Sequence, residues 1–185
     1  MLKEIGMKEI ETGRLILRKF TLDDVDGMYN NWASDFETSK MLDWDVHENR
    51  EVTLSVISNW IKEYEKLFYF NWVVELKENG EIIGNIEIRR CKLRDEICEI
   101  GYCYGSKYWN NGYASEALRA VIQFLINEVG VRIVEAKYIS GNPASGKVME
   151  KAGMKKDAVL RARVINKNTG DVNDFVIYSI MKEEL

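Results

Sequence analysis

The sequence is poor in the residues that build metal centres and disulfide scaffolds. Its 185 residues include one histidine, His47, one proline, Pro143, and three cysteines whose spacing fits neither a zinc pattern nor a redox pair. These counts exclude a His-rich metal site, and we expect no metal cofactor. Cys91 and Cys98 are spaced to meet across a hairpin, but an odd number of cysteines in a chain of this size favours reduced thiols, as in a cytosol.

The sequence also lacks an excess of positive charge and any long hydrophobic run. It carries 26 basic and 30 acidic residues, a net charge of −4, which argues against nucleic acid as a direct partner because binding phosphate backbones needs a basic surface. No apolar stretch approaches the length of a transmembrane helix, and charged residues interrupt the N-terminal segment where a signal peptide needs an apolar core. We therefore expect a cytoplasmic protein without a membrane partner.

What the sequence does contain is an ordinary globular composition, 46% hydrophobic and 30% charged. There is no internal repeat and no linker rich in Pro, Gly or Ser. The length then predicts one domain over residues 1–185, with an ordered core from about residue 10 to residue 182.

Hydrophobic periodicity predicts about seven strands and about four helices. The strands cover residues 14–18, 68–76, 81–90, 97–104, 131–139, 159–165 and 175–181, and the helices cover residues 22–32, 52–64, 114–129 and 143–152. Residues 33–49 have no clear period and are predicted to be loop. The succession of a strand, the long third helix and another strand indicates a parallel crossover within a mixed α/β sheet.

The segment from Tyr104 to Glu116 joins a predicted strand to the start of the long helix. The first N–H groups of a helix have no partner inside it, and the helix dipole favours negative charge at the same place. Gly112 allows the backbone to approach a ligand closely, and Ala114 keeps the first turn free of bulk. Such a loop suits a pyrophosphate. The alternative is an ordinary connection, since neither a P-loop nor a GxGxxG pattern is present.

Three segments in register resemble a known family. Trp109–Ala117 resembles the acetyl-CoA loop of the GNAT acetyltransferase superfamily, in which Gln, Arg or Trp is followed, after two residues, by Gly-x-Gly or Gly-x-Ala and a helix. Asn142–Met154 resembles that family's Asn-x-x-Ser…Glu-Lys-x-Gly-Phe element. Glu11–Arg18 resembles the RimJ/RimL-like branch, which acetylates the N-terminal amines of ribosomal proteins.

The resemblance implies a fold and an activity. The fold is a central, mostly antiparallel sheet with one splayed parallel pair, flanked by helices. The activity is transfer of an acetyl group from acetyl-CoA to a primary amine, by direct attack in a ternary complex. The amine would be a protein N-terminus, as in a ribosomal protein, or a small molecule, and the enzyme a monomer or a homodimer. The alternative is a non-catalytic module that binds or senses acyl-CoA.

The resemblance also assigns cofactor-binding residues. The backbones of Tyr102 and Tyr104 would pair with pantetheine, and Asn142 would hydrogen-bond the same arm. Asn142 is equally suited to cap a helix that begins at Pro143, and the two roles are compatible. Asn111 stands where a basic residue is frequent in the family, which predicts a weaker grip on phosphate. The pyrophosphate would lie on the amides of Asn110, Asn111, Gly112, Tyr113, Ala114 and Ser115.

Two residues are implied for the chemistry. Glu99 lies on the strand beside the cofactor and would take the proton of the amine; alternatively a water chain takes it and Glu99 only hydrogen-bonds. Ser145 would face the sulfur of the leaving thiolate, with Tyr138 and Tyr178 as alternatives. Direct attack requires both a proton acceptor and a group that meets the thiolate.

The substrate side is less defined by the sequence. In the family, the irregular segment 33–49 forms the lip of the acceptor site, so His47 is a candidate for substrate contact or for an ordinary solvated loop. A set of large side chains in and beside this segment is interpreted as core rather than as a substrate cage: Trp32, Phe36, Met41, Trp44 and Trp60.

Overall fold

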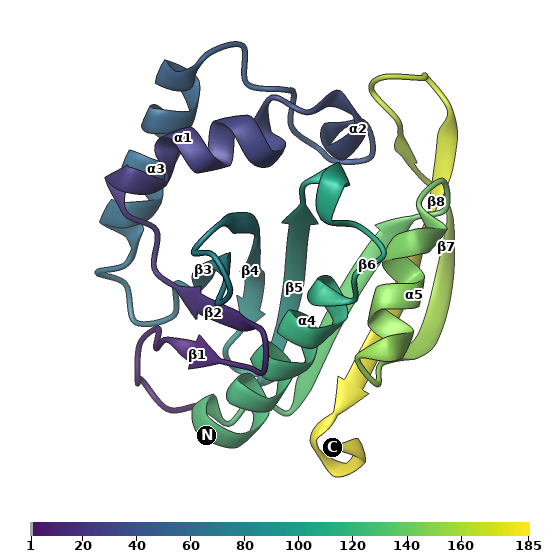
Figure 1. Cartoon of the computed structure of the whole chain (residues 1–185). Helices are drawn as coiled ribbons and strands as arrows, with labels where there is room; N and C mark the ends of the chain where they lie inside the picture. Colours follow the sequence, from purple (N-terminus) through teal and green to yellow (C-terminus); the bar gives the residue numbers. More distant parts are fainter. Residues whose placement is uncertain (1) are drawn as a thin grey trace.

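An eight-stranded sheet forms the centre of the computed structural model, which describes residues 2–185 (Figure 1). Its strand order is β1-β2-β3-β4-β5-β6-β8-β7, and every neighbouring pair is antiparallel except β5 and β6. The strands are β1 (Ile10–Glu11), β2 (Leu15–Arg18), β3 (Asn71–Leu76), β4 (Ile82–Lys92), β5 (Ile97–Tyr104), β6 (Ile133–Ile139), β7 (Lys155–Ile165) and β8 (Val172–Met181).

Five α-helical segments accompany the sheet. They are α1 (Val25–Met28), which lies within a helical run from Leu22 to Ala33, α2 (Phe36–Ser39), α3 (Arg50–Glu63), α4 (Tyr113–Phe124), which continues as a helical turn to Val129, and α5 (Pro143–Lys151). None of the helices within residues 2–185 is long and apolar enough to cross a membrane.

The predicted α/β mixed sheet is confirmed, with two differences in its elements. The two-residue strand β1 adds an eighth strand, because residues 10–11 pair with the far side of β2. The segment predicted as loop, residues 33–49, contains the single turn α2, which the side chain of Asp35 caps by accepting a hydrogen bond from the N–H of Glu37. Both elements are too short to produce a period in the sequence.

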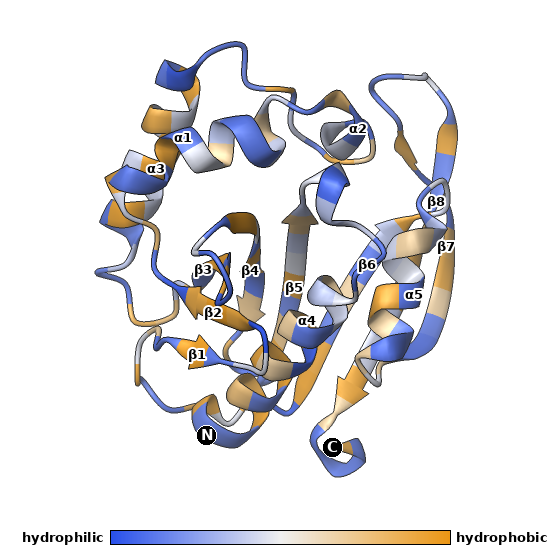
Figure 2. Cartoon of the chain, in the orientation of Figure 1, coloured by the Kyte–Doolittle hydropathy of each residue, from blue (hydrophilic) through white to orange (hydrophobic). Residues whose placement is uncertain are grey.

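The strands alternate between two hydrophobic cores, one on each face of the sheet. In β3, Trp72 and Val74 pack with α4 and α5, whereas Val73 between them packs with α1 and α3. In β5, Tyr104 belongs to the first core and Cys103 to the second. Hydrophobic residues accordingly concentrate along the strands and hydrophilic ones along the connecting loops (Figure 2). This alternation of side chains is the reason the sheet needs helices on both faces.

The parallel pair β5 and β6 opens partway along its length. Hydrogen-bonded pairing runs from Ile97 opposite Ile133 to Ile100 opposite Ala136 and then stops, although β5 continues to Tyr104 and β6 continues to Ile139. The two strands diverge beyond this point (Figure 1). Main-chain groups of residues 101–104 on the β6 side therefore face an opening in the sheet.

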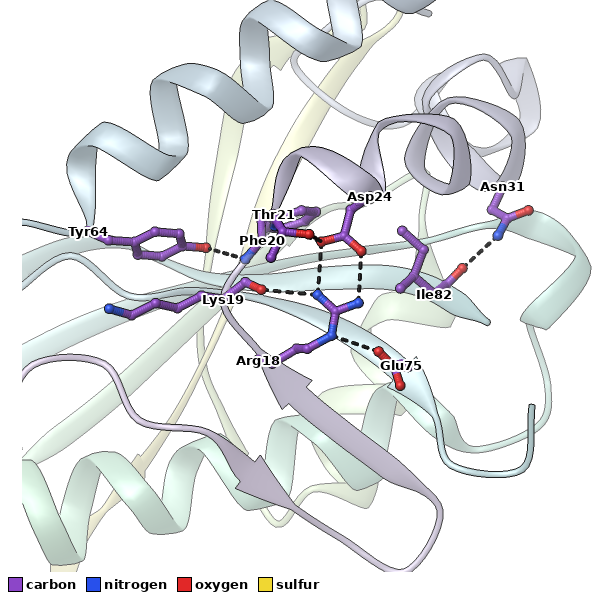
Figure 3. Close-up of polar contacts among 9 residues, drawn as sticks. All are labelled: Arg18, Lys19, Phe20, Thr21, Asp24, Asn31, Tyr64, Glu75 and Ile82. Carbon is purple, nitrogen blue, oxygen red and sulfur yellow. Dashed lines mark hydrogen bonds and ion pairs between the residues drawn. The ribbon is translucent and has the colours of Figure 1, made fainter. Parts of the chain in front are cut away.

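Buried polar contacts fix the layer of α1 and α3 over the sheet (Figure 3). Arg18 at the end of β2 makes two hydrogen bonds to the buried carboxylate of Asp24, at 2.8 and 2.9 Å, and a third to Glu75 on β3 at 2.7 Å. Tyr64, after α3, accepts from the N–H of Phe20 and donates to the carbonyl of Asn71. Bidentate Arg–carboxylate geometry of this kind holds a side chain in one orientation.

The cysteines differ from the sequence-based expectation. Cys91 on β4 and Cys98 on β5 are directly opposite in the antiparallel register and form a disulfide. The prediction of reduced thiols is therefore wrong for this pair, because the count of three cysteines carries no information about which two the strand register brings together. Cys103 is a free, buried thiol.

Candidate active site

The loop before α4 has the shape of an anion-binding site. Asn110 and Gly112 both adopt left-handed backbone conformations, with φ of +64° and +80°, and Gly112 stands at the N-cap without a capping side chain. The indole N–H of Trp109 donates to the carbonyl of Tyr104 at 2.7 Å, and the side-chain amide of Asn111 donates to the carbonyls of Tyr108 and Trp109. The loop side chains thus hold the main chain, and the first amides of α4 keep no partner within the helix.

The first turn of α4 contributes small or outward-facing residues. The hydroxyl of Ser115 donates to the carbonyl of Gly112 at 3.0 Å, while Ala114 and Tyr113 are half-buried. The residues predicted to hold pyrophosphate, from Asn110 to Ser115, are therefore contiguous in space around one helix N-terminus. Their contact with a phosphate stays a prediction.

A cation from the start of the chain reaches this loop. The guanidinium of Arg14 lies 4.6 Å from the ring centre of Tyr113, donates to the carbonyl of Asn111 at 3.0 Å and pairs with Glu116 at 2.6 Å. Burial raises the pKa of Glu116, but hydrogen bonds from Thr12 and Arg14 hold it below its ordinary value overall. These contacts of Arg14 were not predicted from the sequence, although Arg14 belongs to the segment that resembles the RimJ/RimL-like branch. They depend on the position of β2 beside α4.

Two of the predicted residues, Tyr102 on β5 and Ser145 on α5, are in contact with each other. The hydroxyl of Tyr102 lies 2.8 Å from the hydroxyl of Ser145 and donates to the Ser145 carbonyl at 3.0 Å. Burial raises the pKa of Tyr102 far above its ordinary value, so this phenol stays protonated. Asn142 caps α5, its side chain accepting from the N–H of Ser145 at 3.4 Å. The capping role of Asn142 is thus observed, and its contact with pantetheine stays a prediction.

The other tyrosines near α5 are engaged elsewhere. Tyr178 donates to Glu150 at 2.8 Å, and this hydrogen bond together with burial raises its pKa to about 12. The ring of Tyr138 packs against Gly146, where a Cβ would lie only 2.8 Å from the ring. Tyr104 is buried, and its hydroxyl has no hydrogen-bond partner among residues 2–185.

Glu99 lies on β5 just before the opening and carries an ion pair. Its carboxylate is 2.8 Å from the amine of Lys137 on β6, and its side chain is 17% exposed. The carboxylate predicted to act as proton acceptor therefore already has a cationic partner in this structure. Its catalytic role stays a prediction.

A cavity of about 200 Å³ lies on the opposite side of β5 from α4, beneath the layer of α1 and α3. Its floor is formed by Gly101, Tyr102 and Cys103, where β5 runs along the opening, and by neighbouring residues of β4. Its walls are mainly large hydrophobic side chains, namely Met28, Trp32, Leu42, Trp44, Val56 and Trp60. The cavity thus reaches β5 from the face of the sheet opposite to α4.

Three charged residues at this cavity were not selected by the sequence analysis. Glu87 on β4 lies directly opposite Gly101, with its side chain 30% exposed. Arg89 pairs with Asp43 at 2.6 Å and lies 3.5 Å from the carboxylate of Glu87. Burial raises the pKa of Glu87, and the nearby Asp43 adds to this, while Arg89 lowers it. No local motif marks Glu87, which is a single acidic residue in the strand β4.

His47 and the aromatic residues divide between the cavity and the surface. His47 lines the cavity, its Nδ1 lies 2.8 Å from the hydroxyl of Thr53, and burial lowers its pKa. Trp32 is fully buried, whereas Trp44 and Trp60 are partly buried at the cavity wall. Phe36 is 56% exposed, so its assignment to the core is wrong. It lies on the single turn α2, whose buried side is formed by Thr38 and Ser39 instead.

Comparisons with known proteins agree on one family. The acetyltransferase (GNAT) domain matches residues 14–155. A curated relative named uncharacterized N-acetyltransferase YoaA, from Bacillus subtilis (strain 168), is 29% identical over 173 residues, which are 94% of this chain and 96% of that protein. A solved acetyltransferase (GNAT family) from Bacillus anthracis is 27% identical, with a TM-score of 0.83, over 96% of this chain and all of that one. RimL, a ribosomal L7/L12 alpha-N-protein acetyltransferase solved with coenzyme A, has a TM-score of 0.83 at 17% identity, over 94% of this chain and 98% of that one, a likeness of fold.

Proposed function

This chain belongs to the GNAT family of acetyltransferases, and from that premise we propose that it transfers the acetyl group of acetyl-CoA to a primary amine, within a ternary complex of enzyme, acetyl-CoA and amine. The observation that carries the proposal is the position of the anion-binding loop at the end of β5, directly beyond the stretch where β5 and β6 have parted. A cofactor with its pyrophosphate on the loop would extend its pantetheine arm into that opening.

The cofactor assignment is supported by the chemistry of the loop. Helix N-termini bind phosphates through main-chain N–H groups and the helix dipole. Arg14 would add the cation that Asn111 does not supply, since its guanidinium already lies at the loop. RimL, which shares this fold, was solved in complex with coenzyme A. We assign the pyrophosphate to the amides of residues 110–115 and pantetheine to the main chain of Tyr102 and Tyr104 with Asn142.

The reaction needs a proton acceptor on the amine side. An alkylamine with a pKa of about 10.4 is protonated at pH 7 in all but roughly one molecule in a few thousand, so freeing its lone pair costs about 4–5 kcal/mol. A terminal α-amine, with a pKa of about 8, costs only about 1–1.5 kcal/mol. Glu99 and Glu87 are the acidic residues on the cavity face of β5 and β4 that could serve.

The leaving thiolate needs a hydrogen-bond donor on the other side. We propose that Ser145 faces the sulfur and that its hydroxyl is held by Tyr102, at 2.8 Å. A chain of two hydroxyls can pass a proton toward the thiolate without either residue becoming charged. Cys103 is unsuited to a covalent acetyl intermediate, because burial raises the pKa of its thiol and so disfavours the nucleophilic thiolate.

The test measures release of free CoA thiol from acetyl-CoA with purified protein and separate amines: an N-terminal tripeptide, spermidine and 2-phenylethylamine. We expect turnover with at least one amine, and initial-rate lines that intersect, as a ternary complex requires. CoA binding by calorimetry with no turnover on any amine would support the non-catalytic acyl-CoA-binding module instead. Absence of CoA binding would refute both.

A further inference from the structure

The segment of residues 34–49, which joins the helical run ending at Ala33 to α3, is tied at two places to distant parts of the chain. One place is Ser106, at the start of the loop before α4, and the other is the turn of the β7–β8 hairpin. The turn α2 lies between the end of β5 and this hairpin (Figure 1). The segment therefore spans from the predicted cofactor loop to the hairpin at the edge of the sheet.

At the first of these anchors, the main-chain N–H of Ser106 is shared between two side chains of α2 and its cap. It donates to the hydroxyl of Thr38 at 3.1 Å and to the carboxylate of Asp35 at 3.3 Å. Thr38 in turn donates to the same carboxylate at 2.7 Å. Because the side chain of Thr38 is buried, losing these partners would leave its hydroxyl unsatisfied, which is costly.

The carboxylate of Asp35 serves the turn α2 and the loop at the same time. Its other oxygen caps α2 by accepting from the N–H of Glu37 at 3.0 Å. Burial raises the pKa of Asp35, but hydrogen bonds from Ser106 and Thr38 hold it below its ordinary value overall. The carboxylate is therefore charged, which strengthens the hydrogen bonds that it accepts. A helix of four residues is unstable by itself, because its first turn fixes several residues for one hydrogen bond, so α2 depends on this cap and on the anchor.

The main chains of the two segments also touch just before the anchor. Gly105 lies against the carbonyl oxygen of Asn31, so closely that a Cβ on Gly105 would come within 2.0 Å of that oxygen. Both residues are hydrogen-bonded to the start of β4, and the contact of Asn31 is drawn in Figure 3. These contacts fix the residues before Ser106 and before Ala33 on the sheet. The loop from Ser106 onward and the segment after Ala33 are the parts that can shift together.

The anchor is close in the chain to the predicted pyrophosphate site. The carbonyl of Ser106 accepts from the N–H of Trp109 at 3.2 Å, across the short helical turn Ser106–Tyr108. The indole of Trp109 donates to the carbonyl of Tyr104 at 2.7 Å, and Asn110 follows directly. A phosphate that fixes the amides from Asn110 onward would therefore also fix the position of the Ser106 N–H.

On its other side, α2 leads directly into the wall of the cavity of about 200 Å³. The N–H of Leu42 donates to the carbonyl of Ser39, the last residue of α2, at 2.8 Å, and the N–H of His47 donates to the carbonyl of Ala33 at 2.8 Å. A change in the position of α2 would therefore move the cavity wall. The residues of the segment that line the cavity are Leu42, Asp43, Trp44 and His47.

The second anchor holds the segment independently of the loop. The carbonyl of Lys40 accepts from the side-chain amides of Asn166 at 3.2 Å and Asn168 at 3.1 Å, and Lys167 pairs with Asp45. Within residues 2–185, no hydrogen bond or ion pair joins these three hairpin residues to the loop before α4. This anchor therefore stabilises the segment whether or not a ligand occupies the loop.

Resting on the proposed binding of CoA at the loop, we propose that Asp35 and Thr38 are positioning residues that transmit the presence of the cofactor to the cavity wall. With CoA on the loop, the N–H of Ser106 is held against these two side chains, α2 is ordered, and residues 42–47 form the wall. Without CoA, the same segment opens more often. By linkage, an amine that contacts this wall would bind the CoA-loaded protein more tightly than the free protein.

The experiment measures hydrogen exchange of the main-chain amides of residues 36–47 by mass spectrometry, with and without saturating CoA. Exchange of these amides reports local opening of the segment. In wild type we expect CoA to slow the exchange about 5-fold or more, as typical couplings between two sites do. Calorimetry on each protein establishes that CoA is bound. The reporting amides, which are hydrogen-bonded inside the segment, are those of Ser39, Lys40, Leu42 and His47.

Two variants interrupt the anchor without removing α2. Thr38→Val removes the hydroxyl and keeps a side chain of the same shape. Asp35→Asn replaces one acceptor oxygen by an NH₂ group, so the cap and Ser106 compete for the oxygen that remains. In both variants, exchange with and without CoA should agree within about 2-fold, because the coupling is lost. Thr38→Ser restores the hydroxyl and should restore the response to CoA.

Two further variants are matched controls. Glu37→Gln removes a charge from the same turn, where Glu37 pairs only with Lys40, and should keep the full response to CoA. Asn168→Ala weakens the second anchor. It should speed exchange with and without CoA alike and keep their ratio, which is also what a purely structural role of Thr38 and Asp35 would produce.

Two results would overturn the coupling. One is CoA binding to wild type that leaves exchange of residues 36–47 unchanged; the other is a wild-type ratio in both Thr38→Val and Asp35→Asn. The proposed function fails separately. Slower exchange with CoA, but no acetyl transfer to any of the amines, would support the coupling and refute acetyl transfer. Absence of CoA binding to wild type would refute both.

Discussion

The two sides of β5 present different chemical groups to a ligand. On the α4 and α5 side, the loop from Trp109 to Ser115 presents main-chain amides, and its side chains mostly hold the loop itself. On the α1 and α3 side, side chains from five separate segments enclose the cavity. Binding on the first side would depend on the backbone conformation of one loop. Binding on the second side would depend on the identity of several side chains.

This difference predicts different sensitivity to sequence change. A main-chain site tolerates most side chains but depends on the few residues that permit its conformation, such as Gly112 at φ +80°. A side-chain cavity tolerates backbone variation but changes its ligand when one wall residue changes. We therefore expect relatives of this fold to share the cofactor side and to differ on the acceptor side.

The sharpest test of the cofactor side is Gly112→Trp. An indole at this position would cover the amides that bind phosphate, and losing two charge-assisted hydrogen bonds of about 1.5–3 kcal/mol each lowers affinity by at least 100-fold. Calorimetry with CoA measures the loss. Gly112→Ala is the matched control, because it carries the same backbone strain, while its Cβ meets only Arg14 at an ordinary 3.5 Å. Equal CoA affinity in wild type and Gly112→Trp would show that CoA does not bind at this loop.

On the acceptor side, Trp44→Ala should act on the amine and leave the cofactor unaffected. Loss of one ring face costs about 1–2 kcal/mol of binding, which is about a 5- to 30-fold rise in KM for 2-phenylethylamine. The dissociation constant of CoA should not change. Phe36→Ala is the control, because Phe36 is an exposed aromatic residue nearby that does not line the cavity. A change in CoA affinity with a constant KM for the amine would contradict the assignment of CoA and the amine to opposite sides of β5.

Arg14→Ala tests whether the charge of a side chain contributes to CoA binding. We expect CoA affinity to fall by up to about 5-fold, since an ion pair between this half-exposed guanidinium and a phosphate would be worth up to about 1 kcal/mol. The difference from wild type should shrink at high salt, because added ions screen exposed charges. Arg14→Lys keeps the charge and should recover part of the affinity. A difference that is constant with salt would point to a structural role alone.

The smallest effect is expected for Cys103→Ala. Burial raises the pKa of this thiol, which disfavours the nucleophilic thiolate, so kcat should stay within about 2-fold of wild type. Removing a buried sulfur should cost about 1 kcal/mol of stability, or roughly 2–4 °C in Tm. Rate measurements in EDTA, together with double-reciprocal plots, complete the test. Parallel lines and an acetyl-enzyme that disappears in Cys103→Ala would replace direct attack by a covalent mechanism.

The strand and the helix that flank the loop before α4 were predictable because their signals are local. Gly112, the helix α4 that follows it and the strand β5 that precedes it lie within residues 97–124, and the predicted strand 97–104 has the bounds observed for β5. Two helix boundaries were also predictable from the sequence. The helical turn that continues α4 ends at Val129, before the left-handed Gly130, and α5 begins at Pro143. The additional strand β1 and the turn α2 were not, because two and four residues are too few to establish a period.

Contacts that depend on the tertiary structure could not be predicted from the sequence. Arg14 reaches the loop only because β2 lies near α4, about 100 residues away in the chain. The possible pairing of Cys91 with Cys98 across a hairpin was visible in the sequence, but only the register between β4 and β5 shows that the two residues are directly opposite. Glu99 and Glu87 look equivalent in the sequence, as single acidic residues in strands, and they differ only in their neighbours.

The sequence by itself determined most of the strands and helices, the place of Gly112 before the long helix and the resemblance to the family, because periodicity, glycine placement and helix termini act between residues close in the chain. The tertiary structure alone decided where β5 parts from β6, which carboxylate is paired with a cation and which lines a cavity. Those properties arise from strand register and from packing between elements far apart in the chain. Burial and electrostatic pairing therefore distinguish Glu87 from Glu99, and no local pattern does.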